Sequence, residues 1–445
     1  MKITHYSNSF VSIKENNTLI ACDPWIGCGS ENGWLSFPIY KNGTQLLNNI
    51  EPKYIYISHL HCDHFDRINL KKIRNKNIKI IIKKFKNKRL KFKIARLGFK
   101  KIIECDEWKK YKLNKDFSIA IIPQISSNSS DVSDSINFDL DTSIVIQSNI
   151  TKKIFYNNVD NPLNIKDLIK VRQFIKKEFK NDINLCCLPV GAAGEYPHCF
   201  TNINRIKEKK RIISFDLKNL KKQIKALKVK NFFHAGGIYT IFGKFHSLNK
   251  LVATPNDKQI QNLIKKLKVN YFNILGGNNL ELKKNICKKI ISNKFNLPTK
   301  KIAIKETKKI KYFYEKNIIK YDERKLDAQF LKSKEKYFEI IKRFKIKSSW
   351  QIDFYIYKNL FLNNRPKIDK KKSKYLKKYS LNYNRKNKKF SHLKCFLDLS
   401  LFDGMLRKKY IWNPALAGSV VIFERKPNIF DPNLTFSLNF LSCVN

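Results

Sequence analysis

Four side chains that can bind a metal ion directly follow one apolar segment of the sequence. Tyr54–Ser58 is rich in isoleucine and tyrosine and predicts a buried strand. His59, His61, Asp63 and His64 come next, within six residues. Imidazole binds zinc or iron, and a carboxylate adds a hard oxygen ligand. Because side chains alternate along an extended chain, we expect His59 and His61 on one side and the other two on the turn that follows.

The concentration of histidine in this segment favours a metal site over a structural role. The chain has 8 histidines in 445 residues, and three of them lie in this short run beside an aspartate. A lone histidine is usually structural, but this grouping is typical of metal ligands. We therefore predict a site for Zn²⁺, as one or two ions, with Fe or Mn as alternatives.

The spacing HxHxDH after an apolar strand resembles the signature of the metallo-β-lactamase superfamily, which Ser58–Asp66 matches in full. The resemblance implies that His59 and His61 bind a first metal, whereas Asp63 and His64 bind a second. It also implies a catalytic role for Asp63, which would orient the attacking water or take its proton.

Two more ligands are expected at later strand ends. Asp160 follows a predicted strand at Lys153–Tyr156 and fits the aspartate that often bridges both metals in the superfamily; the alternative is a turn residue. His234 follows a predicted strand at Lys230–Phe233 and precedes two glycines, which permit close approach of the backbone. His234 could instead be a satisfied core residue, and His246 is the reserve ligand.

The sequence departs from the superfamily pattern at one ligand of the first metal. The superfamily usually has another histidine between the first motif and the bridging aspartate, but no histidine lies between His64 and His198. Either only one metal binds, or an aspartate substitutes; the choices are Asp131, Asp134, Asp139 and Asp141.

Three other segments resemble proteins near the metallo-β-lactamase-like part of CMP-N-acetylneuraminic acid hydroxylase. These segments are Ala21–Trp25 with Asn32–Trp34, Leu188–Pro197, and Trp412–Ser419. A Rieske iron–sulfur domain needs both a Cys-x-His and a Cys-x-x-His pair, and this sequence does not contain the two together. Hydroxylation by the Rieske route is therefore not expected.

Residues of these segments are candidates for supporting the site. Asp23, at a strand end before a proline, could orient a ligand histidine or simply form a turn. Gly194 and Tyr196 lie in a strand-to-helix loop, whose amides could hold a phosphate group. His246 is a further candidate for contact with the ligands or the substrate.

The order of predicted elements indicates the fold class. Short strands come first, and alternating strands and helices follow from about residue 142. This order suits an αβ/βα sandwich, here assigned to residues 1–300 as the metal-binding catalytic domain. Composition shifts near residue 300, and residues 301–445 are predicted to form a smaller, basic α+β region, with a lysine-rich run at 364–389.

The formal net charge of +54 has two interpretations. Basic surfaces bind nucleic acid, but lysine here is spread over the whole chain as AT-rich coding would produce. Either way, we expect a small anionic substrate to be attracted, with nucleic acid as a less favoured partner. The ten cysteines are mostly spread singly, as is usual for reduced thiols. The N-terminal residues contain no apolar signal region, and no apolar run is long enough to span a membrane. We therefore expect a cytoplasmic protein without a membrane partner. The oligomeric state stays open.

These features together predict a metal-dependent hydrolase that activates a metal-bound water against a phosphorylated or sugar-nucleotide-like substrate. The alternatives are a nuclease of the same fold, an iron-dependent oxygenase and a degenerate binding protein. The sequence has no GxSxG, P-loop or GxGxxG motif that would favour another enzyme class.

Overall fold

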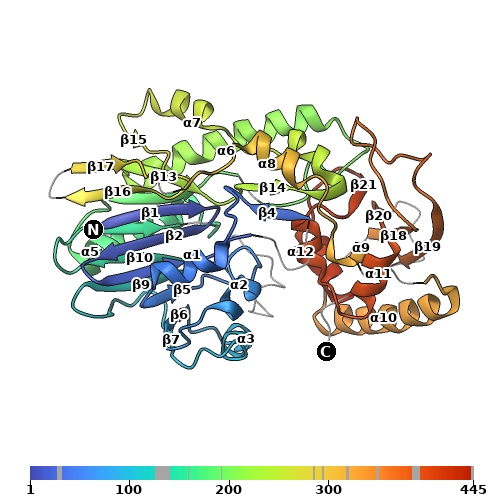
Figure 1. The fold of residues 1–445 in the computed structure, drawn as a ribbon, viewed down its shortest axis with the longest axis horizontal. Helices are drawn as coiled ribbons and strands as arrows, with labels where there is room; N and C mark the ends of the chain where they lie inside the picture. Colours follow the sequence, from blue (N-terminus) through green and yellow to red (C-terminus); the bar gives the residue numbers. More distant parts are fainter. Residues whose placement is uncertain are drawn as a thin grey trace.

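The computed structural model describes residues 1–27, 33–125, 141–158, 160–191, 193–283, 286–292, 295–316, 320–346, 350–382 and 391–441. Within these residues, two large sheets face each other, and helices cover the outer face of each (Figure 1). A smaller sheet with its own helices forms the C-terminal part, drawn in orange and red.

The first sheet combines an antiparallel meander with parallel strands. Its order in the described residues is β17 (Ile286–Ile290), β16 (Asn278–Lys283), β1 (Lys2–Ser7), β2 (Phe10–Glu15), β3 (Thr18–Cys22), β5 (Tyr54–Tyr56), β6 (Lys79–Lys83) and β7 (Ile102–Cys105). Strands β3, β5, β6 and β7 run parallel, which places the carboxyl ends of β3 and β5 side by side. The helices on its outer face are α1 (Gly43–Ile50), α2 (Arg67–Lys72) and α3 (Arg89–Ala95).

The second sheet brings a different part of the chain to the same edge. Its order is β15 (Asn270–Tyr271), β13 (Asn231–Ala235), β12 (Leu185–Pro189), β11 (Ile154–Asn157), β10 (Thr142–Ser148), β9 (Phe117–Pro123) and β8 (Tyr111–Lys112). Helices α5 (Ile165–Phe179), α6 (Arg205–Leu227) and α7 (Asp257–Ile264) cover its outer face.

Apolar residues at alternate strand positions build one core layer between the two sheets and another between the second sheet and its helices. Ile13, Ile119 and Phe155 belong to the cluster between the two sheets. Val145 and Leu168 belong to the cluster under α5 and α6. Because successive side chains of a strand point to opposite faces, one strand supplies both layers. The predicted αβ/βα sandwich is therefore confirmed.

Most predicted elements form, with shifts of one to three residues at their ends. The sequence offers Asn164 or Asp167 as the cap of helix α5, and the helix begins after Asn164, whose side chain accepts a hydrogen bond from the Asp167 amide in a capping box. Two predictions about strands are wrong. Strand β13 extends to Ala235, so His234 lies inside the strand and not after it. The aromatic and aliphatic residues near Tyr271–Leu275 also predict a strand, but β15 ends at Tyr271.

The C-terminal part is an α+β unit, as predicted. Its sheet has the order β19 (Tyr375–Asn382), β18 (Trp350–Tyr357), β20 (Ser391–Asp398) and β21 (Ile422–Lys426). Its helices are α8 (Lys300–Thr307), α9 (Phe313–Lys316), α10 (Glu323–Arg343), α11 (Leu399–Leu406), α12 (Trp412–Ala417), α13 (Pro432–Leu438) and the 3-10 turn η3 (Asn439–Leu441).

One hydrophobic cluster crosses the predicted domain boundary at residue 300. Trp34 lies on β4 (Trp34–Ser36), which pairs with β14 (Tyr239–Ile241), and both strands contribute to the core of the C-terminal part. The 3-10 segment η2 (Gly243–Leu251) adds Phe245 to the same cluster. The boundary between 300 and 301 stays a prediction, and the two parts share a continuous core.

Two lysines of the basic run at 364–389 form ion pairs with carboxylates of the same chain. Lys377 pairs with Glu323 and Asp327 at 2.6 and 2.7 Å, and Lys378 pairs with the buried Asp353 at 2.8 Å. Residues 383–390 of the run lie outside the described residues. No helix in the described residues combines the length and apolar character that crossing a bilayer requires.

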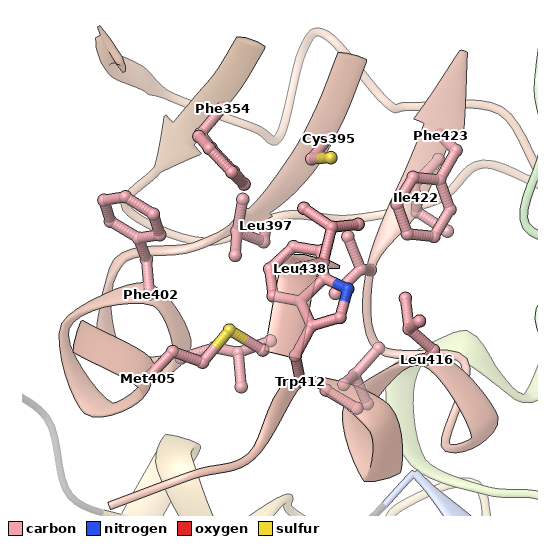
Figure 2. Close-up of a cluster of buried hydrophobic side chains, with 14 of the residues drawn as sticks. Phe354, Cys395, Leu397, Phe402, Met405, Trp412, Leu416, Ile422, Phe423 and Leu438 are labelled. Carbon is pink, nitrogen blue, oxygen red and sulfur yellow. The ribbon is translucent and has the colours of Figure 1, made fainter. Parts of the chain in front are cut away.

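Trp412 is expected to anchor the C-terminal core. Its indole is 1% exposed and packs edge-on against Phe354 at 5.8 Å, among the side chains shown in Figure 2. We expect Trp412→Ala to lower the free energy of unfolding by about 3–5 kcal/mol, because truncation leaves a cavity. Urea unfolding followed by circular dichroism measures this loss. Phe430→Ala is the control, because Phe430 is 74% exposed; equal losses in both variants would contradict the anchoring role.

Candidate metal centre

The motif loop is fixed at both ends by hydrogen bonds. Strand β5 stops at Tyr56, and the next amide, that of Ile57, still donates to the Ile81 carbonyl at 3.0 Å. At the other end, the Asp66 carboxylate caps α2 by accepting from the Asn69 amide at 3.1 Å. The side chains between these anchors are therefore held in one orientation at the sheet edge.

A first group of possible ligands consists of His59, His61 and Asp141. The ligand atoms of the three side chains lie within 4.8 Å of one another. His59 Nε2 lies 2.7 Å from His61 Nδ1 and 3.1 Å from Asp141 Oδ1. The strand β10 begins directly after Asp141, and the Thr142 hydroxyl donates to the Ser58 carbonyl at 2.8 Å. This bond holds the start of β10 against the motif loop.

A second group consists of His59, His64 and Asp160, again with ligand atoms within 4.8 Å of one another. His64 Nε2 lies 2.8 Å from Asp160 Oδ2. Asp160 follows β11, and its φ of 61° turns the chain sharply at the point where the carboxylate reaches the site. His59 belongs to both groups, so the two groups together comprise five side chains and share one ligand.

The electrostatics of the two buried histidines differ. Burial lowers the pKa of His59 well below its usual value, and the neighbouring His64 and His61 lower it further. His59 is therefore neutral and offers a lone pair. Burial also opposes the charged form of His64, but the carboxylates of Asp63, Asp23 and Asp160 raise its pKa well above the usual value. The second group thus attracts positive charge.

The residues present fit a divalent metal ion. Imidazole nitrogens and carboxylate oxygens converge from a rigid loop and from the ends of two strands, which is the donor chemistry of Zn, Fe and Mn sites. Three carboxylates surround His64, so the site favours a positive charge. A bound metal ion would supply that charge.

Asp23 lies where a carboxylate that orients a ligand histidine is required. It is fully buried; its Oδ1 accepts from the Ser58 amide at 2.8 Å, and its Oδ2 lies 3.0 Å from His64 Nδ1. An acceptor at Nδ1 leaves Nε2 of His64 directed at Asp160 and the metal space. Asp63 lies beside this pair, with Oδ2 3.5 Å from His64 Nε2, outside both groups of three.

The structure does not bring His234 into either group. Its neighbours on β13, Phe233 and Ala235, belong to the core between the sheets, so His234 points to the opposite, helix-covered face. There its Nδ1 lies 2.7 Å from the Tyr271 hydroxyl. The ligand role of His234 stays a prediction that this geometry does not support. His246 Nδ1 donates to the Gly243 carbonyl at 2.9 Å and is also outside both groups.

Gly194 and Tyr196 border the junction of the two parts. A Cβ atom added at Gly194 would meet no atom within 4 Å, so the loop is open there. The Tyr196 hydroxyl donates to Glu208 at 2.8 Å and accepts from Asn428 at 2.9 Å. Gly194 therefore retains space for a ligand, whereas the polar end of Tyr196 is used within the protein.

The three segments that resemble one branch of the superfamily meet in space. A Cβ atom at Gly33 would lie 2.0 Å from the Gly418 carbonyl oxygen, so only glycine permits this approach. On the same side, His198 Nε2 lies 2.7 Å from the Ser419 hydroxyl, and Trp34 packs edge-on against Tyr239 at 5.4 Å. The C-terminal segment thus packs against the segment that contains Gly33 and Trp34.

The sequence leaves four aspartates as possible substitute ligands, and within the described residues Asp141 lies beside His59 and His61. The other three choices, Asp131, Asp134 and Asp139, lie outside the described residues. The available signal was position: Asp141 directly precedes a predicted strand at Thr142–Gln147, where a side chain can be held at a sheet edge. Sequence alone did not show which strand end faces the motif.

Comparison with known proteins shows limited similarity. No family model matches the chain. A candidate Rieske 2Fe-2S iron-sulfur protein of Mycobacterium tuberculosis is 30% identical over 125 residues, which cover 27% of this chain and 24% of that protein. Another from Mycolicibacterium smegmatis is 27% identical over 118 residues, 26% of this chain and 22% of that protein. The match spans about a quarter of the length of these relatives.

Solved structures of similar arrangement include a possible metal-dependent hydrolase from Veillonella parvula, with a TM-score of 0.44 and 15% identity, covering 63% of this chain and 99% of that one. CmlA, a diiron β-hydroxylase from Streptomyces venezuelae, has a TM-score of 0.42 and 13% identity, covering 63% of this chain and 54% of that one.

The fold and the motif lead to the same assignment. The two facing sheets carry helices on both outer faces, and the HxHxDH loop leaves the end of β5 at their common edge. The loop and two later strand ends together supply two groups of metal-binding side chains. The chain thus has the metallo-β-lactamase fold, and its HxHxDH loop, which resembles the signature of that superfamily, lies at the edge of its sheets.

Proposed function

We propose that the chain is a metal-dependent hydrolase acting on a small anionic substrate, phosphorylated or similar to a sugar nucleotide. The observation that carries the proposal is the pair of ligand groups that share His59. Such a pair can hold one ion or two, next to the Asp63 carboxylate, whose Oδ2 lies 3.5 Å from His64 Nε2. A bound divalent ion supplies a Lewis acid and makes a coordinated water acidic enough to react near neutral pH.

Asp63 is the proposed acceptor of the proton from the attacking water. Its side chain is buried, with 5% of the residue exposed, and burial by itself raises a carboxyl pKa. The neighbouring His64 and His61 outweigh this effect and lower the pKa of Asp63 below its usual value. The carboxylate is therefore ionised at neutral pH and can accept a proton.

The preference for an anion follows from charge and from open space. The chain carries a net charge of +54, which attracts anions from solution. Gly194 lies on the segment that packs beside the C-terminal part. Its backbone is open, and we propose that a group of the substrate approaches the chain there. Nucleic acid remains a less favoured substrate, because lysines of the basic run pair with carboxylates of the chain.

Asp63→Asn is expected to lower kcat by about 10²–10⁴-fold while metal content changes little, because the amide keeps the shape but does not accept the proton as a carboxylate does. Hydrolysis of bis(p-nitrophenyl) phosphate, p-nitrophenyl phosphate and a sugar nucleotide is measured after loading with Zn²⁺, Mn²⁺ or Fe²⁺. No turnover of any of these by the loaded wild-type chain would contradict the proposal. Preferential cleavage of RNA, lost in high salt, would favour the nuclease instead.

An iron-dependent oxygenase is the second candidate, and one observation favours it. Asp141 supplies an oxygen ligand where the superfamily usually has a histidine, so the site as a whole is richer in carboxylate. Carboxylate ligands shift the preference of a site from zinc toward iron or manganese. Oxygen consumption by the Fe²⁺-loaded chain in the presence of a reductant and a substrate separates this candidate from the hydrolase.

A further inference from the structure

One buried hydroxyl lies between the two ligand histidines. Ser58 is 0% exposed, and its Oγ is 2.9 Å from His59 Nδ1 and 3.1 Å from His64 Nδ1. No other described hydroxyl is recorded in contact with both rings. His59 belongs to both ligand groups, and His64 belongs to the second group alone. The Ser58 hydroxyl therefore contacts a ligand of each group from the side opposite the metal space.

The other nitrogen of each ring faces the metal space. His59 Nε2 points to His61 and Asp141, and His64 Nε2 points to Asp160. A ring can bind a cation through Nε2 only when that nitrogen has its lone pair free, so the hydrogen of the neutral ring must then sit on Nδ1. Each Nδ1–H in turn needs an acceptor in this buried environment.

We propose that Ser58 is a positioning residue that fixes both ligand histidines in the Nδ1–H form. A hydroxyl oxygen has two lone pairs, so Ser58 Oγ can accept from both rings. His64 Nδ1 also lies 3.0 Å from Asp23 Oδ2 as a close charged contact, whereas the hydrogen-bond partner of His59 Nδ1 is Ser58 Oγ. The consequence is stronger for His59, the ligand that both groups share.

The backbone around Ser58 keeps the hydroxyl in this place. Its amide donates to Asp23 Oδ1 at 2.8 Å, and its carbonyl accepts from the Thr142 hydroxyl at 2.8 Å. Thr142 is in turn hydrogen bonded to the Tyr56 hydroxyl at 2.6 Å. Because both backbone groups are bound, removing the side-chain hydroxyl changes the support of the two rings without releasing the loop.

The inference rests on the proposed metal centre but not on hydrolysis, so its test uses two readouts that need no turnover. The full-length chain is stripped with a chelator and titrated with Co²⁺ and Zn²⁺ against a competing chelator. We expect Ser58→Ala to bind Co²⁺ and Zn²⁺ about 10–100-fold more weakly, which is the usual effect of removing a hydrogen-bond partner of a ligand histidine. Ser58→Thr, which keeps the hydroxyl, is expected to recover most of the affinity.

The second readout is the position of the ring hydrogen. Nitrogen NMR of the chain with labelled histidine is expected to show Nδ1–H for His59 and His64 in the wild type with Zn²⁺, and a loss of this form at His59 in Ser58→Ala. Ser12→Ala is the matched control, because Ser12 is a buried serine on β2 whose hydroxyl lies 3.5 Å from Tyr6 and contacts no ligand.

The outcomes separate the two proposals. Wild-type metal affinity in Ser58→Ala, or Nε2–H at His59 in the loaded wild type, would overturn the role of Ser58. Tight metal binding with the expected change in Ser58→Ala but no hydrolysis would leave this role intact and count against the hydrolase. A wild-type chain that binds neither Co²⁺ nor Zn²⁺ would overturn both.

Discussion

His59→Ala is expected to empty the whole metal centre, because His59 is the ligand that the two groups share. Metal bound per chain after gel filtration is expected to fall to background, and hydrolysis to fall with it. The loss of affinity should exceed the roughly 10–100-fold that follows from removing a partner behind a ligand. Elemental analysis of the purified chain measures this directly.

The other ligand variants show whether the two groups act separately. His61→Ala and Asp141→Ala remove ligands of the first group alone, and His64→Ala removes a ligand of the second group alone. If two ions bind, each of these variants should retain one. His392→Ala is the control, since that ring lies on β20 and pairs with Asp353 at 2.7 Å. Retention of tightly bound metal by His59→Ala would show that the shared position is not a ligand.

Asp23→Asn is expected to damage the second group selectively. Asp23 Oδ1 accepts from the Ser58 amide at 2.8 Å, and Asp23 Oδ2 lies 3.0 Å from His64 Nδ1. An asparagine side chain has one oxygen and one NH₂, so it can accept from only one of these directions. If its NH₂ faces His64 Nδ1, the ring hydrogen must move to Nε2, which points at the metal space. We expect metal affinity at the second group to fall by about 10–100-fold.

The same competition titration measures this loss, with Asp116→Asn as the matched control. Asp116 is 2% exposed and accepts from Asn16 at 3.0 Å and from the Thr18 hydroxyl, but it contacts no histidine. The first group should keep its affinity in both variants. Equal metal affinity in Asp23→Asn and the wild type would show that the Asp23–His64 contact does not control the ring.

Local pattern was enough to predict the motif and most strands. His59, His61, Asp63 and His64 are contiguous, and a strand that ends just before them predicts that they leave a sheet together. Strands β2 and β3 and the capped helix α5 have signals contained within their own residues, such as alternating apolar positions or the Asn164 cap. These features need no knowledge of distant contacts.

The position of His234 shows the limit of such local reasoning. A difference of two residues in the end of β13 places the histidine inside the strand, where alternation directs it to the face opposite the core between the sheets. The extension is set by pairing with β12, in which Leu188 lies opposite His234. A pattern of residue types does not contain this pairing.

The sequence by itself determined that a cluster of possible metal ligands follows β5 and that the chain forms a two-sheet sandwich. Only the tertiary structure decided that Asp141 and Asp160 reach the cluster, that His59 is shared, and that the C-terminal part packs against Trp34 and η2. The physical reason is separation along the chain. Asp141 lies far from the motif in sequence, and the packing of two sheets, through contacts such as Thr142 to Ser58, sets which strand ends meet.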